Sequence, residues 1–476
     1  MTLRDNERIV TKIKNVLERR ETYFIFFIMC VVYLSNCFNY MSSTDTIPAI
    51  LLPFSILDQH NIYLDNFIDY YNNSSNWWGT YFFTESRGHW VSSYPIVAPL
   101  LATPLYLLPY IFTKLMGIPV DMGNTTFFLM VYAMEKISAA VIAALSGVVF
   151  YLLLRELFDK KVALIGVFLY AFATSTWTIG SQGMWQHGTS ELLLCLILLL
   201  LVKNIKVPKG ISYVYLGILS GLLVFNRPTN AILLLPVLYY LLKSSRDNIL
   251  RYGISLAAVS VPFLAYNLYF FGGLFGGYGG LTSLYSFDPE AMTRLAGLLI
   301  SPSRGLFIYT PIALLAIPGF FYVKKIKEDR IRNVFYLGGL AVALTTLMYS
   351  FYEFWWGGGC YGPRFFTDII PLIVIFVMFF VNDVLQNRGD GHKNVLIGAV
   401  LLLLAASVLV QVIGAHLYPV YGFQWGHGET ITFDDQSKLW DWSDTQISQS
   451  LDGLFNSSNK GYRINIDNGT VSVSKG

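Results

Sequence analysis

The feature that most constrains the fold of this chain is a series of long, almost uncharged apolar segments between residues 22 and 413. A helix needs about 20 mostly apolar residues to cross a bilayer. Only 13% of the residues are charged, against about 25% in a typical soluble domain. We therefore expect an all-α, polytopic membrane protein that has the lipid bilayer and no nucleic acid as a partner. It should have about eleven transmembrane helices, at 22–40, 126–153, 161–181, 187–202, 211–226, 229–242, 252–271, 305–323, 333–351, 365–381 and 394–413.

Clusters of Lys and Arg indicate which loops face the cytoplasm, because the cytoplasmic loops of membrane proteins are enriched in both residues. One cluster lies in the N-terminal segment, and later clusters follow every second predicted span, at 155–161, 203–209, 243–251, 324–332 and 388–393. We therefore expect a multi-pass protein of the cell (plasma) membrane. Its N-terminus should be cytoplasmic and its C-terminus extracytoplasmic.

The same reasoning divides the chain into three parts. Residues 1–21 form a cytoplasmic N-terminal segment, residues 22–413 a single transmembrane domain, and residues 414–476 a short extracytoplasmic tail. Within the transmembrane domain, residues 41–125 form a long outer loop.

An apolar stretch in this outer loop, 95–117, holds four prolines: Pro95, Pro99, Pro104 and Pro109. The charge alternation allows one crossing between residues 95 and 155, and 126–153 is the better span. We therefore expect 95–117 to form juxtamembrane helices at the outer surface. An ordinary transmembrane helix is the alternative.

The cysteines indicate neither a metal site nor a disulfide framework, because they show no paired spacing. Cys30, Cys37 and Cys195 fall in or near apolar runs, and Cys360 lies in a predicted loop. We expect no cofactor, and a divalent metal stays an open alternative.

Three arginines sit where a predicted outer loop meets a span: Arg227, Arg304 and Arg364. A cation at membrane depth is costly, and usually pairs with an anion or lines a cavity. Three such cations from distant segments could converge on one phosphate or pyrophosphate, which arginine binds with two parallel hydrogen bonds. The alternative is that each arginine reaches lipid headgroups or caps helix carbonyls.

One acid, Asp45, stands among small hydroxyl residues in "NYMSSTDTIPAILLPF", just after the first predicted span. "SSTD" before an apolar run is a good helix start, so Asp45 could cap a helix. Other cations, histidines and aromatic residues of the outer side complete the candidate set: Arg87, His89, Tyr94, Lys136, Trp185, His187, Glu353, Trp356 and Tyr361.

Five blocks of the sequence, in their order, resemble the GT-C superfamily of lipid-carrier-dependent glycosyltransferases, near the protein mannosyltransferase and aminoarabinose transferase clan. The blocks are "STDTIPAILLPFSIL", "GHWVSSYPIVAPLLATP", "NRPTNAILLLP", "SPSRGLFIYTP" and "WWGGGCYGPRFFTDIIP". The resemblance covers roughly residues 40–420. Many members carry an Asp-Glu pair, whereas Thr46 follows Asp45 here, so a second carboxylate and a metal are unassigned. The short polar tail argues against an oligosaccharyltransferase.

The resemblance implies a function at the outer membrane surface. It implies transfer of a sugar from a polyprenyl-phosphate donor to an acceptor hydroxyl, with inversion and with Asp45 as the general base; Asp58, Asp65 and Asp69 are rival acids. The acceptor would be a glycan, a lipid-linked saccharide or a protein. Arg364 is the first candidate for the donor phosphate, ahead of Arg304, Arg227, Arg87 and Lys136. The sugar or acceptor would contact His89, Tyr94, Trp185, His187, Glu353, Trp356 and Tyr361. A transporter or flippase of lipid-linked sugars is the alternative, although it would favour internal repeats and midplane charges that the sequence lacks.

Overall fold

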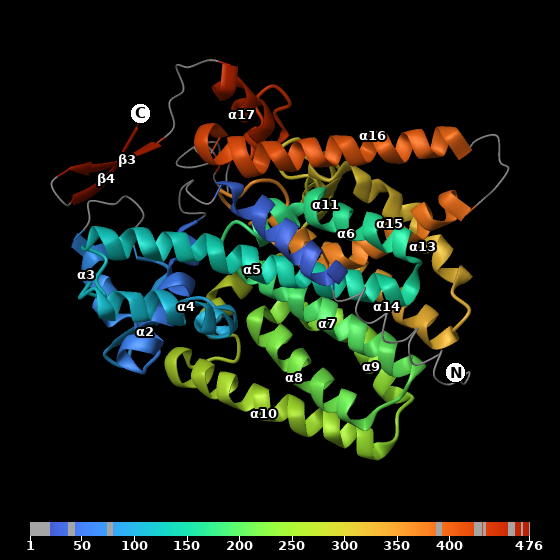
Figure 1. Cartoon of the computed structure of the whole chain (residues 1–476), viewed down its shortest axis with the longest axis horizontal. Helices are drawn as coiled ribbons and strands as arrows, with labels where there is room; N and C mark the ends of the chain where they lie inside the picture. The colour runs from blue at the N-terminus through green and yellow to red at the C-terminus, as the bar shows by residue number, and fades with distance from the viewer. Residues whose placement is uncertain are drawn as a thin grey trace, which may run out of the picture.

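The computed structural model describes residues 20–36, 43–73, 80–386, 393–422, 431, 435–455, 462–467 and 470–475. Most of the predicted cytoplasmic segment 1–21 and parts of the tail 414–476 therefore lie outside the described residues. The described part is mostly helical, and its long helices run side by side along the longest axis of the molecule (Figure 1). The expectation of an all-α membrane protein is thus confirmed.

Six helical segments of the described residues are long and apolar enough to cross a membrane. They are α5 (Thr125–Leu157), α7 (Gln186–Lys206), α10 (Arg246–Phe271), α14 (Asp329–Ser350), the segment Arg364–Gln386 and the segment Lys393–Tyr418. The segment from Arg364 comprises the short turn η8 (Arg364–Ile369) and α15 (Ile370–Gln386), and the last begins with α16 (Lys393–Val412).

The other predicted spans are built from shorter helical pieces. They are a helix at 20–33, α6 (Lys160–Phe172) with η3 (Thr176–Gly180), α8 (Gly210–Asn226), η4 (Pro228–Leu234) with α9 (Leu235–Leu242), and α12 (Leu306–Tyr309) followed by η6 (Pro311–Leu315) and α13 (Ala316–Tyr322). Pro228 and Pro311 each begin a 3₁₀ turn. Proline has no backbone N–H and interrupts the helical ladder, which explains why these spans are divided.

The predicted juxtamembrane stretch 95–117 forms one helix, α4 (Val97–Leu115), although Pro104 and Pro109 lie inside it. It is not among the six span candidates of the described residues. It packs beside α2 (Ile47–Gln59), and both lie with α3 (Asp65–Asn73) near the start of α5 (Figure 1). A hairpin joins this group, β1 (Phe83–Ser86) with β2 (His89–Ser92), and its two-residue turn at Arg87 and Gly88 has positive φ at both positions.

Helix packing around α15 forms the core, and most residues of α15 are buried. By contrast, α10 exposes most of its surface and approaches α8 closely. A Cβ at Gly217 of α8 would come within 2.1 Å of Ser255 Oγ on α10, so only glycine allows this close approach. Small residues at such contacts are typical of helices that pack inside a membrane.

The connections between helices alternate between the two ends of the bundle. The turns after α5, α7, α9 and η7 (Val323–Lys325) lie at one end, and the longer segments 173–185, 272–290 and 351–363 lie at the other. The longer segments include η5 (Gly276–Leu284) and lead into α11 (Ala291–Ile300). This second end carries the site described below.

Parts of the C-terminal tail also reach this end of the bundle. Its remaining elements are η9 (Ile413–Gly422), η10 (Ser437–Trp440), α17 (Gln446–Phe455), β3 (Tyr462–Asp467) and β4 (Thr470–Lys475), with β3 and β4 forming a second hairpin. Trp355 Nε1 donates to Gln436 Oε1 over 2.9 Å, and Gly362 N donates to Gln446 Oε1 over 2.9 Å. The tail therefore supports the loop that precedes Arg364.

Candidate active site

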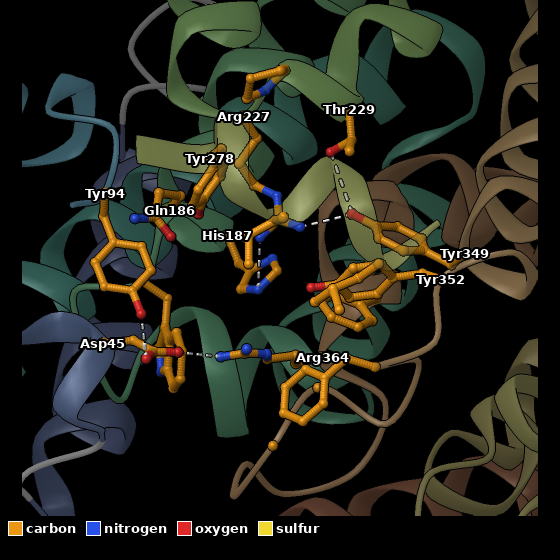
Figure 2. Close-up of a pocket in the computed structure, with 18 of the residues that line it drawn as sticks. Asp45, Tyr94, Gln186, His187, Arg227, Thr229, Tyr278, Tyr349, Tyr352 and Arg364 are labelled. Carbon is orange, nitrogen blue, oxygen red and sulfur yellow. Dashed lines mark hydrogen bonds and ion pairs between the residues drawn. The ribbon is translucent and has the colours of Figure 1, made fainter. Parts of the chain in front are cut away.

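A cavity of about 810 Å³ opens at the end of the bundle where the long connections gather. Its lining comes from the segment before α2, the loops around β1 and β2, the start of α7, the turn after α8, η5 and the loop before η8. Figure 2 shows Asp45 and Arg364 on one side of the cavity and Arg227 with Thr229 on the other. Six tyrosines contribute to the lining: Tyr81, Tyr94, Tyr278, Tyr285, Tyr349 and Tyr352.

Asp45 belongs to a short 3₁₀ turn, η2 (Thr44–Thr46), that precedes α2. The cap of this turn is Ser43, whose Oγ accepts a hydrogen bond from Asp45 N over 3.2 Å. The N-cap of α2 is Thr46, whose side chain makes no capping hydrogen bond. The alternative that Asp45 is a helix cap is therefore wrong, and its carboxylate is free to face the cavity.

A buried contact holds the turn that carries Asp45 against the bundle. Thr46 Oγ1 donates to Glu135 Oε1 of α5 over 2.6 Å. Thr46 and Glu135 are both almost fully buried. The threonine that replaces the second acid of the expected pair thus links Asp45 to a carboxylate on another helix.

The Asp45 carboxylate has three partners from distant segments. Its Oδ1 accepts hydrogen bonds from the hydroxyls of Tyr81, over 2.8 Å, and Tyr94, over 2.6 Å. Its Oδ2 lies 3.0 Å from Arg364 Nη1. Burial and the nearby Asp45 charge raise the pKa of Tyr94 well above the ordinary value for tyrosine. Tyr94 therefore stays protonated at neutral pH and donates to Asp45.

Arg364 lies at the start of η8, where the chain leaves a glycine-rich loop. Its guanidinium carbon is 4.4 Å from the centre of the Trp185 ring, and its Nε is buried without a hydrogen-bond partner among the described residues. Gly362, two residues earlier, has φ of +66°, and a Cβ there would come within 2.6 Å of Tyr309. Only glycine therefore allows the tight turn that directs Arg364 toward Asp45.

A second charged group lies on the opposite side, where Arg227, His187 and Asp368 meet. Arg227 Nε lies 2.9 Å from Asp368 Oδ2, and His187 Nδ1 lies 2.9 Å from Asp368 Oδ1. Arg227 Nη1 lies 3.2 Å from His187 Nε2. A guanidinium only donates and a carboxylate only accepts. His187 is therefore neutral, with its proton on Nδ1.

Arg227 also donates from Nη2 to the Tyr349 hydroxyl over 2.7 Å. Among the described residues, the hydrogen bonds to His187 and Tyr349 use two of the five N–H groups that a guanidinium carries, and the Nε N–H faces Asp368 in an ion pair. Two N–H groups of Arg227 are therefore left for a ligand, and the residue lines the cavity. Among the described residues, the Arg364 side chain makes one hydrogen bond, to Asp45, and it lines the same cavity.

The structure does not bring three of the predicted phosphate ligands into the cavity. The Arg304 guanidinium donates to the carbonyls of Trp356, Ser303 and Gly358 over 2.7–2.9 Å, so it supports a loop. Arg87 lies over the Tyr269 ring at 4.3 Å and donates to the Tyr269 carbonyl, and Lys136 donates to the Gln182 carbonyl over 2.6 Å. The sequence identified the charge of these residues and their approximate position along the membrane normal. The direction in which each side chain points depends on neighbours that are far away along the chain.

Of the residues predicted to contact sugar or acceptor, Tyr94, Trp185 and His187 line the cavity. The other four lie elsewhere. His89 stacks on Tyr63 at 3.8 Å and bonds Asp65, and the Tyr361 hydroxyl donates to the Val410 carbonyl over 2.9 Å. Glu353 and Trp356 stand in the loop before η8 but do not line the cavity.

Several cavity residues were missed by reasoning from sequence. The polar ones are Tyr81, Gln186, Thr229, Tyr278, Tyr349 and Tyr352, and Asp368 lies behind Arg227. Tyrosines are common in this chain, 31 of 476 residues, so no single one stood out. Asp368 did carry a signal, because it is an acid four residues after Arg364 at the start of an apolar run.

Metal binding receives no support from the described residues. No group of three or more His, Cys, Asp or Glu side chains among them is placed to hold a metal ion. The described lining of the cavity offers one carboxylate, two guanidiniums, one imidazole and a set of hydroxyl and amide groups.

Comparison with known proteins agrees with this architecture. Residues 130–270, which include α7 and Arg227, match the family model described as dolichyl-phosphate-mannose-protein mannosyltransferase. No curated protein matches the sequence significantly.

Solved structures are similar to this chain at low sequence identity. The apo oligosaccharyltransferase of Archaeoglobus fulgidus has a TM-score of 0.50 and 12% identity, over 83% of this chain and 55% of that one. This chain thus spans about half the length of that protein. ArnT from Cupriavidus metallidurans bound to undecaprenyl phosphate has a TM-score of 0.49 and 9% identity, over 84% of this chain and 75% of that one. The family match over residues 130–270 and the fold shared with the archaeal oligosaccharyltransferase make this chain similar to the membrane glycosyltransferases of the GT-C superfamily.

Proposed function

We propose that this protein transfers a sugar from a polyprenyl-phosphate donor to an acceptor hydroxyl at the extracytoplasmic face of the plasma membrane. One observation carries the proposal: Asp45, Arg364 and Arg227, from three distant segments, line one large cavity. The basic clusters at the opposite end of the bundle support an extracytoplasmic site, with the N-terminus inside and the C-terminus outside. The acceptor is a glycan, a lipid-linked saccharide or a protein.

Asp45 would act as the general base. The acceptor oxygen attacks the anomeric carbon and loses its proton to an Asp45 oxygen. The bond between the anomeric carbon and the phosphate oxygen breaks, and polyprenyl phosphate leaves with the electron pair. A single displacement of this kind inverts the anomeric carbon. A positioned base accounts for about 10²–10⁴-fold in rate.

Arg364 and Arg227 would stabilise the charge that grows on the leaving phosphate. Their N–H groups without partners suit the oxygens of a phosphate, which arginine binds with two parallel hydrogen bonds. Such donors stabilise the transition state because they are already oriented in a site with little water.

A transporter or flippase of lipid-linked sugars is the other candidate. It would carry the donor between two compartments without consuming it, whereas an enzyme consumes it in detergent. The position of the charged cavity residues at one end of the bundle favours the enzyme, because alternating access places the binding site near the midplane.

The test is turnover of a panel of polyprenyl-phosphate sugars by purified protein in detergent, with several acceptors. Asp45→Asn should lower the rate by about 10²-fold or more while the protein stays folded. Asp58→Asn is the matched control, because Asp58 is an acid of the same outer loop that pairs with Lys114 away from the cavity. Equal loss in both variants, or no loss in Asp45→Asn, contradicts the role of Asp45.

A further inference from the structure

The charges around the cavity constrain the chemistry of the sugar itself. Among the described residues that line it, the charged side chains are Asp45, Arg227 and Arg364. His187 also lines the cavity and is neutral, because it accepts from Arg227 and donates to Asp368. Asp45 is already paired with Arg364, and Asp368, which is 1% exposed, lies behind Arg227.

An amino sugar would therefore find no unpaired carboxylate in the described lining. Its ammonium group would instead face two guanidiniums, Arg227 and Arg364, and like charges near each other are unfavourable. A charged group that loses water without gaining a partner is strongly disfavoured. A carboxylated sugar meets the opposite difficulty, because it would compete with the donor phosphate for the same two arginines.

The remaining lining is neutral and suited to hydroxyl groups. The hydroxyls of Tyr278 and Tyr352 and the side-chain amide of Gln186 line the cavity and have no hydrogen-bond partner among the described residues. Thr229 contributes a further hydroxyl, 3.3 Å from that of Tyr349 (Figure 2). Hydroxyl and amide groups can each donate and accept, which matches the hydroxyls of a sugar. The aromatic rings around them offer flat apolar faces to the sugar ring.

We infer that the sugar this protein transfers is uncharged, carrying neither an amino nor a carboxyl group. This inference rests on the proposed function and names its substrate class. The neutral groups of Gln186, Tyr278, Tyr352 and Thr229 would bind the sugar, and the two arginines would bind only the phosphate. A site whose polar groups match one substrate rejects a charged analogue because its charge is left unpaired.

The experiment compares three classes of donor on one polyprenyl phosphate: neutral hexoses, the matching amino sugars and the matching uronic acids. The neutral donor should be consumed at least about 10²-fold faster than either charged class. An amino or uronic donor used as fast as the neutral one overturns the inference but leaves the proposed function standing. If no donor of any class is consumed with any acceptor, the proposed function fails and the inference fails with it.

A designed carboxylate gives a second, independent readout. Gln186 is the first residue of α7, where the positive end of the helix dipole favours an acid, so Gln186→Glu should fold and stay ionised. It should raise the rate with amino donors relative to neutral donors by about 10-fold, because the ammonium gains a partner. Gln186→Met is the control, since it removes the amide without adding charge and should not favour amino donors. An unchanged preference in Gln186→Glu contradicts the assignment of Gln186 to the sugar.

Discussion

Asp45 and Arg364 stand 319 positions apart in the sequence, and their side chains lie 3.0 Å apart in the cavity. The pair joins the start of α2 to the start of η8, and both side chains are largely buried, at 19% and 12% exposed. The contact therefore couples the proposed base to the proposed phosphate ligand. Substitutions of Arg364 should therefore affect catalysis, whereas substitutions of an arginine that only supports the fold should affect stability.

Arg364 and Arg304 looked alike in the sequence but should respond differently to substitution by lysine. Arg364→Lys removes the planar guanidinium that can bind a phosphate with two parallel hydrogen bonds, and it removes the contact with Trp185. Donor turnover should therefore fall by about 10²-fold with little loss of stability. Arg304→Lys should lower the free energy of unfolding by about 2 kcal/mol or more, because a single ammonium cannot replace the three guanidinium nitrogens that bind the three loop carbonyls. Turnover per folded molecule and chemical unfolding in detergent measure the two effects. Equal kinetic losses would contradict the distinction.

The buried pair of Arg227 and Asp368 should show strong energetic coupling. Asp368→Asn leaves Arg227 buried without its counter-charge, which should cost about 3–5 kcal/mol of stability. The double variant with Arg227→Gln should lose less than the sum of the single variants, by about 0.5–3 kcal/mol. A double-mutant cycle of unfolding free energies measures this coupling. Additive losses would show that the 2.9 Å contact does not stabilise the fold.

Tyr81 and Tyr94 donate to the same oxygen of Asp45 but differ in exposure. Tyr81 is 58% exposed, so an acceptor hydroxyl can replace it at Asp45 Oδ1 without disturbing the fold. Tyr81→Phe should therefore change the turnover number by less than about 3-fold, and Tyr94→Phe should lower it by about 10-fold, since Tyr94 orients the carboxylate. Steady-state turnover of both variants with one donor is the measurement. The reverse order would assign the orienting role to Tyr81.

The raised pKa of Tyr94 predicts an alkaline loss of stability. Tyr94 holds its proton more tightly in the folded than in the unfolded state, because burial and Asp45 disfavour its phenolate. Its contribution is complete below about pH 10, the ordinary pKa of tyrosine, and is lost as the pH rises beyond it toward the raised folded value. Above pH 10, Tyr94→Phe should reduce the slope of the unfolding free energy against pH by up to about 1.4 kcal/mol per pH unit. Unfolding curves from pH 7 to pH 11 test this, and parallel curves would contradict it.

Much of the fold follows from local features of the sequence. Each apolar segment must form a helix in a bilayer because every backbone polar group needs an internal partner. The division of the spans at 228–242 and 306–322 also has a local cause, since proline breaks the helical ladder at known positions. The continuity of α4 through Pro104 and Pro109 was not expected, and its packing against α2 explains why the helix persists.

Some features of the site also follow from the sequence, whereas others depend on the tertiary structure. The sequence by itself determined that Asp45, Arg227 and Arg364 are ionisable groups at the ends of helices. Such groups indicate a functional site because a charged side chain near a bilayer is costly unless it is paired or lines a cavity. Only the tertiary structure decided that Arg304, Arg87 and Lys136 turn toward backbone carbonyls, and that Asp368 completes the group around Arg227. The physical reason is that a guanidinium can donate hydrogen bonds to backbone carbonyls as well as to a phosphate. Which partner each guanidinium binds depends on how helices that are hundreds of residues apart in the sequence pack together. A local sequence pattern does not contain that information.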